Sequence, residues 1–167
     1  DTFEKINKFA SSADFFGLTS SITPSWHLQS FFILYTQSLF SSSLFKQHWF
    51  NICALKSKYD IVMNYEVQWS MRLKRLGFKG ISLYGDDFSL AENCTHIHWD
   101  KLLKSNYPYL KKELVRDNPL MINLKNLPDI ISSFDENWTQ HILEYLSRYG
   151  EQVSDLSTFL SDSRELD

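Results

Sequence analysis

The stretch from Asn64 to Phe78 has the clearest alternation of apolar and polar positions in the chain. Apolar or aromatic side chains recur there at steps of three and four residues, at Ile61, Tyr65, Trp69, Leu73 and Leu76. This spacing predicts a helix that packs one face on a core. Gly77 comes directly after the last apolar position, where a glycine permits the left-handed backbone that ends a helix. Glu66 is then an acid in the first half of a largely buried helix.

Other segments predict strands and a second helical region. Residues 13–19 form a compact apolar stretch around Gly17, which predicts a strand that ends in a tight turn. Residues 26–35 are rich in aromatic and apolar side chains and predict one buried central strand. Residues 36–57 predict a helical connection, and residues 78–84 alternate as a short strand does. The mixture predicts an α/β fold.

The two ends of the chain predict helices. Residues 1–12 predict a short polar helix or an irregular lead-in, and a further short helix starts at Asp100 and is broken near Pro108. A longer helix is predicted from Asp135, with an apolar stripe and a closing glycine at position 150. Residues 151–167 carry only a weak apolar stripe and predict a frayed helix or a linker.

Composition sets limits on the class of protein. The 167 residues are 43% hydrophobic and 16% aromatic, which is enough for one well-cored domain. The net charge of -3 makes a nucleic-acid partner improbable on electrostatic grounds. Cys53 and Cys94 form no Cys-x-x-Cys pattern and favour a reducing compartment. No apolar run reaches the roughly 18 residues that a membrane span needs.

The helix that contains Glu66 resembles one in nucleotide-sugar glycosyltransferases of the type A fold, where an acid opens a helix that ends in Gly-Phe or Gly-Tyr. The carboxylate of that helix takes the proton of the acceptor hydroxyl, so the resemblance implies that Glu66 is the general base. The motif usually has two adjacent acids, and Val67 stands at the second position here. Without the resemblance, a single Glu on a helix is more often simply solvated.

A series of motifs in one order resembles the rhamnan synthesis protein F family, bacterial glycosyltransferases of cell-surface polysaccharide assembly. Phe16 stands where tryptophan is expected, and the resemblance covers about residues 13–119. The motifs are Asp14-Phe15-Phe16-Gly17-Leu18-Thr19, His27-Leu28-Gln29-Ser30-Phe31-Phe32, Phe45-Lys46-Gln47-His48-Trp49, Tyr65-Glu66 and Leu114-Val115-Arg116-Asp117-Asn118-Pro119.

The resemblance implies a partial type A glycosyltransferase domain, with a mixed sheet, flanking helices and additional C-terminal helices. Such folds carry their diphosphate-binding half on the N-terminal side. Residues 1–119 would therefore be the acceptor-side part of the domain, and residues 120–167 a C-terminal helical extension.

The resemblance also implies which residues bind substrate. In open α/β sheets ligands lie over the carboxyl ends of the strands. The implied substrate-binding residues there are Asp14, Gly17, Thr19, His27 and Gln29. His27 has an alternative role as a core or capping histidine, and Gln29 as a buried amide satisfied by loop backbone.

Two further residues are implied near the diphosphate. Arg116 could grip phosphate oxygens with its guanidinium fork, or it could form a local pair with Asp117. His96 sits where a late histidine completes the metal shell of many type A enzymes. In a strand, His96 and His98 would face opposite sides, so that one at most could reach a single metal.

The implied cofactor is a divalent cation, Mg²⁺ or Mn²⁺, whose main ligands would lie outside this chain. Asp86 and Asp87 are adjacent acids after a glycine, and turn chemistry explains them better than a metal site does. No Asp-x-Asp motif occurs between Ala13 and Tyr84.

The implied function is transfer of a sugar, with rhamnose one candidate, from a nucleotide-diphosphate donor to a growing surface polysaccharide. The partners would be a nucleotide-sugar donor and a glycan or lipid-linked glycan acceptor, without nucleic acid. Such acceptors imply a cytoplasmic location with peripheral association at the inner face of the plasma membrane. The alternative is a non-catalytic carbohydrate-binding or scaffolding module derived from such an enzyme.

Overall fold

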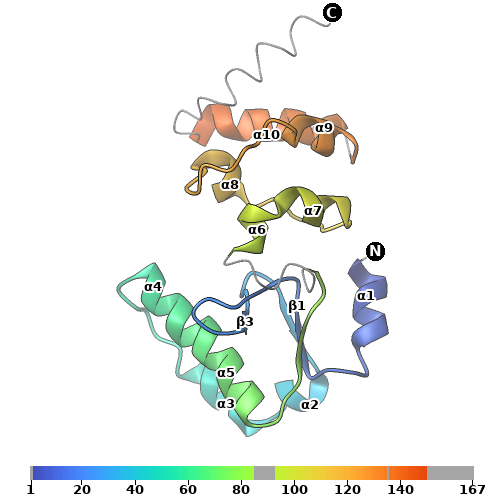
Figure 1. Cartoon of the computed structure of the whole chain (residues 1–167). Helices are drawn as coiled ribbons and strands as arrows, with labels where there is room; N and C mark the ends of the chain where they lie inside the picture. Colours follow the sequence, from blue (N-terminus) through green and yellow to red (C-terminus); the bar gives the residue numbers. More distant parts are fainter. Residues whose placement is uncertain (1, 85–92, 135, 150–167) are drawn as a thin grey trace, which may run out of the picture. The chain divides into compact units, whose positions relative to one another are not determined.

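The computed structural model describes residues 2–84, 93–134 and 136–149 (Figure 1). By packing, the chain divides into two compact units, residues 1–94 and 95–167. The described part of the first unit is built of helices and short strands, and that of the second unit is helical. The prediction of a mixed α/β chain is therefore confirmed.

The sheet of the first unit has strand β1 (Phe15–Gly17) at its centre. Strand β4 (Ile33–Tyr35) pairs with it in antiparallel fashion, and β5 (Gly80–Ser82) pairs with its other edge in parallel. The sheet is thus mixed, as predicted. Strands β2 (Ser20–Ser21) and β3 (His27–Leu28) form a separate antiparallel pair.

The single strand predicted over residues 26–35 is wrong. The segment contains β3 and β4, which belong to different sheets and are separated by a turn at Ser30 and Phe31. The segment is rich in aromatic and apolar side chains, yet Phe31 is 53% exposed. The polar pair Gln29 and Ser30 marks the point where the chain leaves one sheet for the other.

The long predicted helix is present and consists of three consecutive parts. Helix α4 (Lys58–Ile61) leads into a π-helical turn, η1 (Val62–Val67), and then into α5 (Gln68–Arg75). In the π-helical turn the backbone N–H of Gln68 donates to the carbonyl of Met63, five residues earlier. Gly77 follows with a φ of 89°, so the predicted left-handed end is confirmed.

Helices α2 (Gln37–Phe40) and α3 (Ser43–Phe50) form the predicted helical connection. Figure 1 shows α3 and α5 together on one side of the strands and α1 (Thr2–Phe9) on the other. Apolar side chains from the strands and helices form the core: Phe15, Leu28, Leu39, Phe45, Trp69 and Leu73. This core fixes α5, and with it the position of the turn that carries Glu66.

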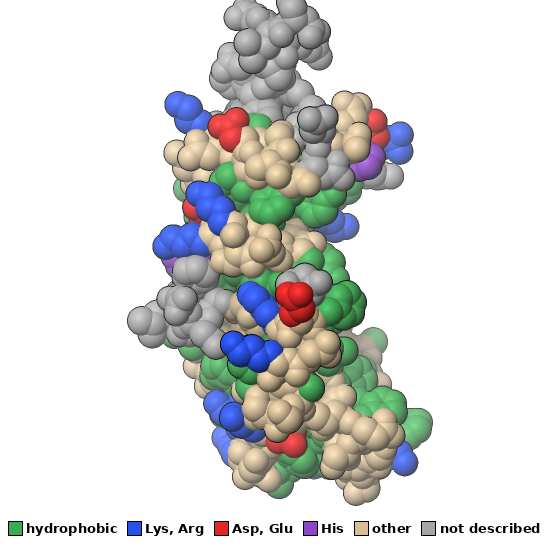
Figure 2. All heavy atoms as spheres, turned by 90° about the vertical axis from the view of Figure 1, so that its right-hand side faces the viewer, with side chains coloured by type: hydrophobic (Ala, Val, Ile, Leu, Met, Phe, Trp, Pro, Cys, Tyr) green, Lys and Arg blue, Asp and Glu red, His purple; other side chains and the backbone are tan. Residues whose placement is uncertain are grey.

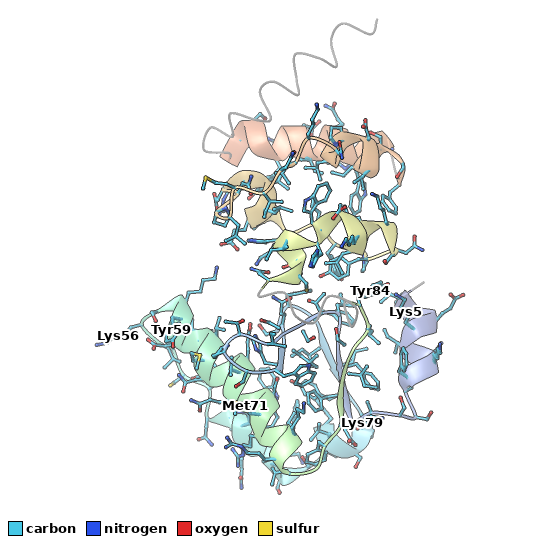
Figure 3. All side chains as sticks on the ribbon, in the orientation of Figure 1. Lys5, Lys56, Tyr59, Met71, Lys79 and Tyr84 are labelled. Atoms are coloured by element: carbon cyan, nitrogen blue, oxygen red, sulfur yellow. The ribbon has the colours of Figure 1, made fainter. Side chains whose placement is uncertain are left out.

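Helix α1 contacts the rest of the first unit through Tyr84. The Thr2 hydroxyl lies 2.7 Å from the Tyr84 hydroxyl, and the Lys5 amine lies 3.6 Å from the centre of the Tyr84 ring (Figure 3). None of the helix residues is buried. On the side of the first unit that carries α1, basic, acidic and apolar side chains are interspersed (Figure 2).

The second unit contains α6 (Cys94–Ile97), α7 (Trp99–Lys104), α8 (Lys112–Arg116), α9 (Leu127–Ser132) and α10 (Glu136–Tyr149). Its core is formed by Trp99, Leu103, Leu114, Val115, Leu124, Leu127 and Ile131. The boundary predicted at residue 119 marks the reach of the motifs and falls within this unit. The helices predicted from Asp100 and Asp135 are present, although Asp135 and Gly150 lie outside the described residues.

Candidate functional site

Glu66 lies on the π-helical turn, with two polar neighbours at its carboxylate. Its side chain is 17% exposed. The Ser30 hydroxyl donates a hydrogen bond to Oε1 of Glu66, and Nε2 of His27 lies 3.9 Å from Oε2. The carboxylate is therefore held in place from one side while part of it still reaches solvent.

The imidazole of His27 is fixed by its own backbone contacts. His27 lies on β3, its side chain is only 4% exposed, and its Nδ1 lies 2.8 Å from the carbonyl oxygen of Ser25. A carbonyl can only accept, so Nδ1 carries a hydrogen and donates it. Nε2 is then the nitrogen that faces Glu66. The 3.9 Å separation is too long for a hydrogen bond but close enough for the charge of one group to act on the other.

The π-helical turn sets the direction of Glu66. Val67, Trp69 and Leu73 are buried and tie the helix to the core. The Ser70 hydroxyl accepts from the backbone N–H of Leu28, which anchors the same helix to β3. A π-helical turn inserts one extra residue per turn, and such turns are frequent at functional sites. Here it lies between the anchored part of the helix and α4.

Thr19 and Gln29 form a pair beside β3. The Thr19 hydroxyl donates to Oε1 of Gln29 at 2.6 Å, and the backbone N–H of Gln29 donates to the Thr19 carbonyl at 3.1 Å. The carboxamide oxygen of Gln29 is thus satisfied by a side chain rather than by loop backbone. Its amide nitrogen makes no hydrogen bond within the described residues, so it can donate to a ligand.

Asp14 and Gly17 have clear structural roles. Oδ2 of Asp14 accepts from the backbone N–H of Lys79 at 2.7 Å, which ties the start of β1 to the start of β5. A Cβ at position 17 would lie 2.9 Å from Cδ2 of Leu28, so a side chain there would collide with the core. Their roles in substrate binding stay predictions.

His96 belongs to the second unit and lies on α6, not on a strand. The opposite-face argument for His96 and His98 therefore does not hold, because residues 94–97 are helical. His96 is buried, and its Nε2 lies 3.8 Å from Oε2 of Glu113. Glu113 also lies 3.4 Å from the Lys111 amine.

Arg116, on α8, forms the local pair that was one of its two predicted roles. Its Nε donates to Oδ1 of Asp117 at 2.7 Å, and its terminal nitrogen donates to Oδ2. These hydrogen bonds and the charge of Asp117 raise the pKa of Arg116 above its usual range. A diphosphate at Arg116 would have to compete with this carboxylate.

The predicted divalent cation finds no set of ligands among the described residues. No three His, Cys, Asp or Glu side chains in that part of the chain lie close enough together to hold a metal. His96 and Glu113 provide two groups at most. The adjacent acids Asp86 and Asp87 lie outside the described residues.

The comparison with protein families shows to which family the chain is related. The family model described as rhamnan synthesis protein F matches residues 1–162. The chain belongs to the rhamnan synthesis protein F family. The resemblance seen in the motifs is confirmed, and the match extends well beyond Pro119 into the C-terminal helices. No curated protein and no solved structure gives a significant match to the chain.

Membership of the rhamnan synthesis protein F family associates the chain with the biosynthesis of polysaccharide. Among residues 2–84, 93–134 and 136–149, none of the helices combines the length and the hydropathy that a membrane span requires. One neighbour of Glu66, Ser30, was not predicted as a site residue, although it lies within one of the motifs named above. A serine gives no distinctive pattern, and its contact with Glu66 joins residues 36 positions apart.

Proposed function

We propose that the chain provides the acceptor side of a glycosyltransferase of type A fold, in which Glu66 is the general base. The transferred sugar comes from a nucleotide-diphosphate donor and joins a growing cell-surface polysaccharide. Rhamnose is the candidate sugar, since the family is named for rhamnan synthesis. The observation that carries the proposal is the Glu66 carboxylate, which is bound by Ser30, faces His27 and remains partly exposed.

In the proposed reaction one bond forms, one bond breaks and Glu66 receives the proton that is released. An acceptor hydroxyl oxygen forms a bond to the anomeric carbon of the donor sugar, and the bond from that carbon to the diphosphate oxygen breaks. Glu66 takes the proton of the hydroxyl, and the diphosphate leaves with the bonding electrons. The Ser30 hydroxyl orients the carboxylate, and Nε2 of His27 lies 3.9 Å from its other oxygen. The amide nitrogen of Gln29 is available as a donor to a sugar hydroxyl.

The same proposal indicates where in the cell the reaction would take place. A lipid-linked glycan acceptor would place the reaction at the cytoplasmic face of the plasma membrane, with the chain associated peripherally. A divalent cation, Mg²⁺ or Mn²⁺, would supply charge neutralisation for the leaving diphosphate when bound.

Replacing Glu66 with glutamine in the full-length protein tests the role of the base. The amide keeps the shape and the contact with Ser30 but cannot take a proton, so we expect transfer to fall by about 10²–10⁴-fold. Donor affinity should be nearly unchanged, because only a transition-state role is lost. Transfer is measured from a panel of nucleotide sugars, and donor binding by calorimetry.

Asp60→Asn is the matched control, because Asp60 is an acid on the same long helix whose carboxylate is bonded to Ser57. Its transfer rate should stay close to that of the unchanged protein. Unreduced transfer in Glu66→Gln would remove Glu66 from the mechanism.

A second candidate function, a non-catalytic carbohydrate-binding module, is favoured by a cavity in the second unit. This cavity of about 440 Å³ is lined by the aromatic side chains of Tyr109, Trp138 and Tyr145, among others. Flat aromatic rings in an apolar hollow suit the faces of sugar rings. Oligosaccharide binding that is lost in Trp138→Ala, together with no transfer across a broad donor and acceptor panel, would favour this candidate.

A further inference from the structure

A second cavity lies in the first unit, between α3 and the long helix. Its volume is about 470 Å³, and it is lined by His48, Asn64, Gln68, Trp69, Met71, Arg72 and Arg75. Met71 is labelled on this helix in Figure 3. No acid is among the lining residues. The cavity therefore combines two permanent positive charges with a histidine and two carboxamides.

No acid among the lining residues balances the basic groups at this cavity. Within the described residues, neither Arg72 nor Arg75 has a carboxylate within ion-pair distance. Burial and, secondarily, the charge of Arg72 lower the pKa of His48. The His48 ring is stacked flat on Trp69, with ring centres 3.8 Å apart and planes 6° apart, so it cannot easily turn away. Like charges around one hollow are unfavourable unless an anion joins them.

The helix dipole explains only part of this arrangement. Basic residues are favoured in the last turn of any helix, and Arg72, Lys74 and Arg75 all occupy that turn of α5. Lys74 lies in the same turn but does not line the cavity, and its amine lies 4.2 Å from the centre of the Trp26 ring. The dipole does not explain why both arginines share a polar hollow with His48.

The cavity is also separate from the candidate catalytic carboxylate. Its residues from the long helix are Asn64, Gln68, Met71, Arg72 and Arg75, together with Trp69, and their three- and four-residue steps place most of them on one face. Glu66 is not among them. Ser70, whose hydroxyl accepts from Leu28, turns a different face of the helix toward β3.

We propose that this cavity binds a phosphate group, as a phosphate or diphosphate ester. The planar guanidinium forks of Arg72 and Arg75 match phosphate oxygens. The carboxamide of Gln68 can donate a further hydrogen bond, while the Asn64 amide already donates to the Asp60 carbonyl at 2.8 Å. A phosphate here would neutralise the positive charges that line the cavity. The proposal does not depend on Glu66 being a catalytic base.

The test is a titration of the chain with inorganic pyrophosphate, followed by NMR of the His48 ring and by calorimetry. We expect saturable binding, with the pKa of His48 rising on binding because the anion offsets Arg72. The Arg72→Gln, Arg75→Gln double variant should bind at least about 10-fold more weakly, since charge-assisted hydrogen bonds are lost. Lys74→Gln is the matched control for each single variant, Arg72→Gln and Arg75→Gln, because it also removes one positive charge from the same turn but does not touch the cavity.

Two further arms identify the source of the phosphate. One uses a free nucleoside diphosphate, and the other uses vesicles of phosphatidylglycerol, with phosphatidylcholine vesicles for comparison. Exposed Trp49 and Phe50 lie on α3 next to His48 in sequence, which makes the vesicle arm worthwhile. Arginine-dependent binding in either arm supports the site and names its ligand.

The proposal is overturned if pyrophosphate, nucleotide and vesicles all fail to bind, or if the double variant binds like Lys74→Gln. Thermal unfolding of both variants guards against a folding defect. Because the arginines are exposed, we expect both variants to unfold close to the temperature of the unchanged chain. Transfer activity is not read in this test, so its outcome is independent of that for Glu66.

Discussion

Replacing Gly80 with alanine would test how the aromatic residues around β1 hold the first unit together. Gly80 pairs with Phe15 across the parallel strands β1 and β5. A Cβ at position 80 would lie 2.4 Å from Cζ and 2.6 Å from Cε2 of Phe15, and 2.8 Å from Cη2 of Trp26. Ordinary contacts at such a Cβ are 3.4–4 Å, so the neighbours would have to move by about an ångström.

The Phe15 ring has little room for this movement. It is 1% exposed, it stacks on Tyr35 with ring centres 6.4 Å apart, and it meets the edge of Trp26 at 6.3 Å. Inserting a methyl group into a filled core typically costs about 1–3 kcal/mol. We therefore expect Gly80→Ala to lower the free energy of unfolding by about that amount, or the midpoint by roughly 4–8 °C per kcal/mol for a unit of this size.

The assay is urea unfolding followed by tryptophan fluorescence, combined with a double-mutant cycle. Phe15→Leu alone should destabilise the unit by leaving space, but in the presence of Gly80→Ala that space accepts the new methyl group. The double variant should therefore lose less unfolding free energy than the two single variants lose together. Strict additivity, or a Gly80→Ala variant as stable as the unchanged chain, would refute the reasoning. Trp26 precedes His27, so we also expect a shifted His27 and slower transfer in Gly80→Ala.

Three further predictions concern single contacts. Asp14→Ala removes the bond to the Lys79 backbone and should lower the free energy of unfolding by about 1 kcal/mol, measured by urea unfolding. Ser42→Ala removes the side-chain cap of α3 and should cost about 0.5–2 kcal/mol in the same assay. The pKa of His48 is lower in the folded chain than its ordinary value of 6.5. Between these two pKa values the unfolded chain therefore binds more protons than the folded chain does. Stability should thus fall as the pH drops from 6.5 toward the folded pKa, and His48→Gln should flatten this part of the profile.

The long helix could be predicted because its apolar residues repeat regularly and a glycine closes it. Its π-helical turn could not, since the hydrogen bond from Gln68 to Met63 depends on how the two ends of the helix pack. Glu66 and His27 were both predicted as site residues from the family resemblance. Their approach to 3.9 Å depends on the place of β3 beside the helix, which local sequence does not specify.

The wrong prediction of one strand comes from a short apolar run. The run at 26–35 is dense in aromatic and apolar side chains, and such runs do not distinguish strand, helix and turn. Tertiary pairing divides this run between two sheets. For His96 and His98 the argument depended on a strand, and the structure has α6 at this place instead. For Arg116, the sequence left two roles open, and the neighbouring Asp117 carboxylate fills one of them.

The π-helical turn also accommodates one extra residue between α4 and α5. Because such a turn holds one residue more than an α-helical turn, removing one residue from it would leave a continuous α-helix. The buried Trp69 and Leu73 would keep α5 in place, and the segment Lys58–Ile61 would keep nearly the same facing because each π-helical residue advances less about the helix axis. A single deletion in this turn would therefore be absorbed there, without unseating the core beneath the rest of the helix.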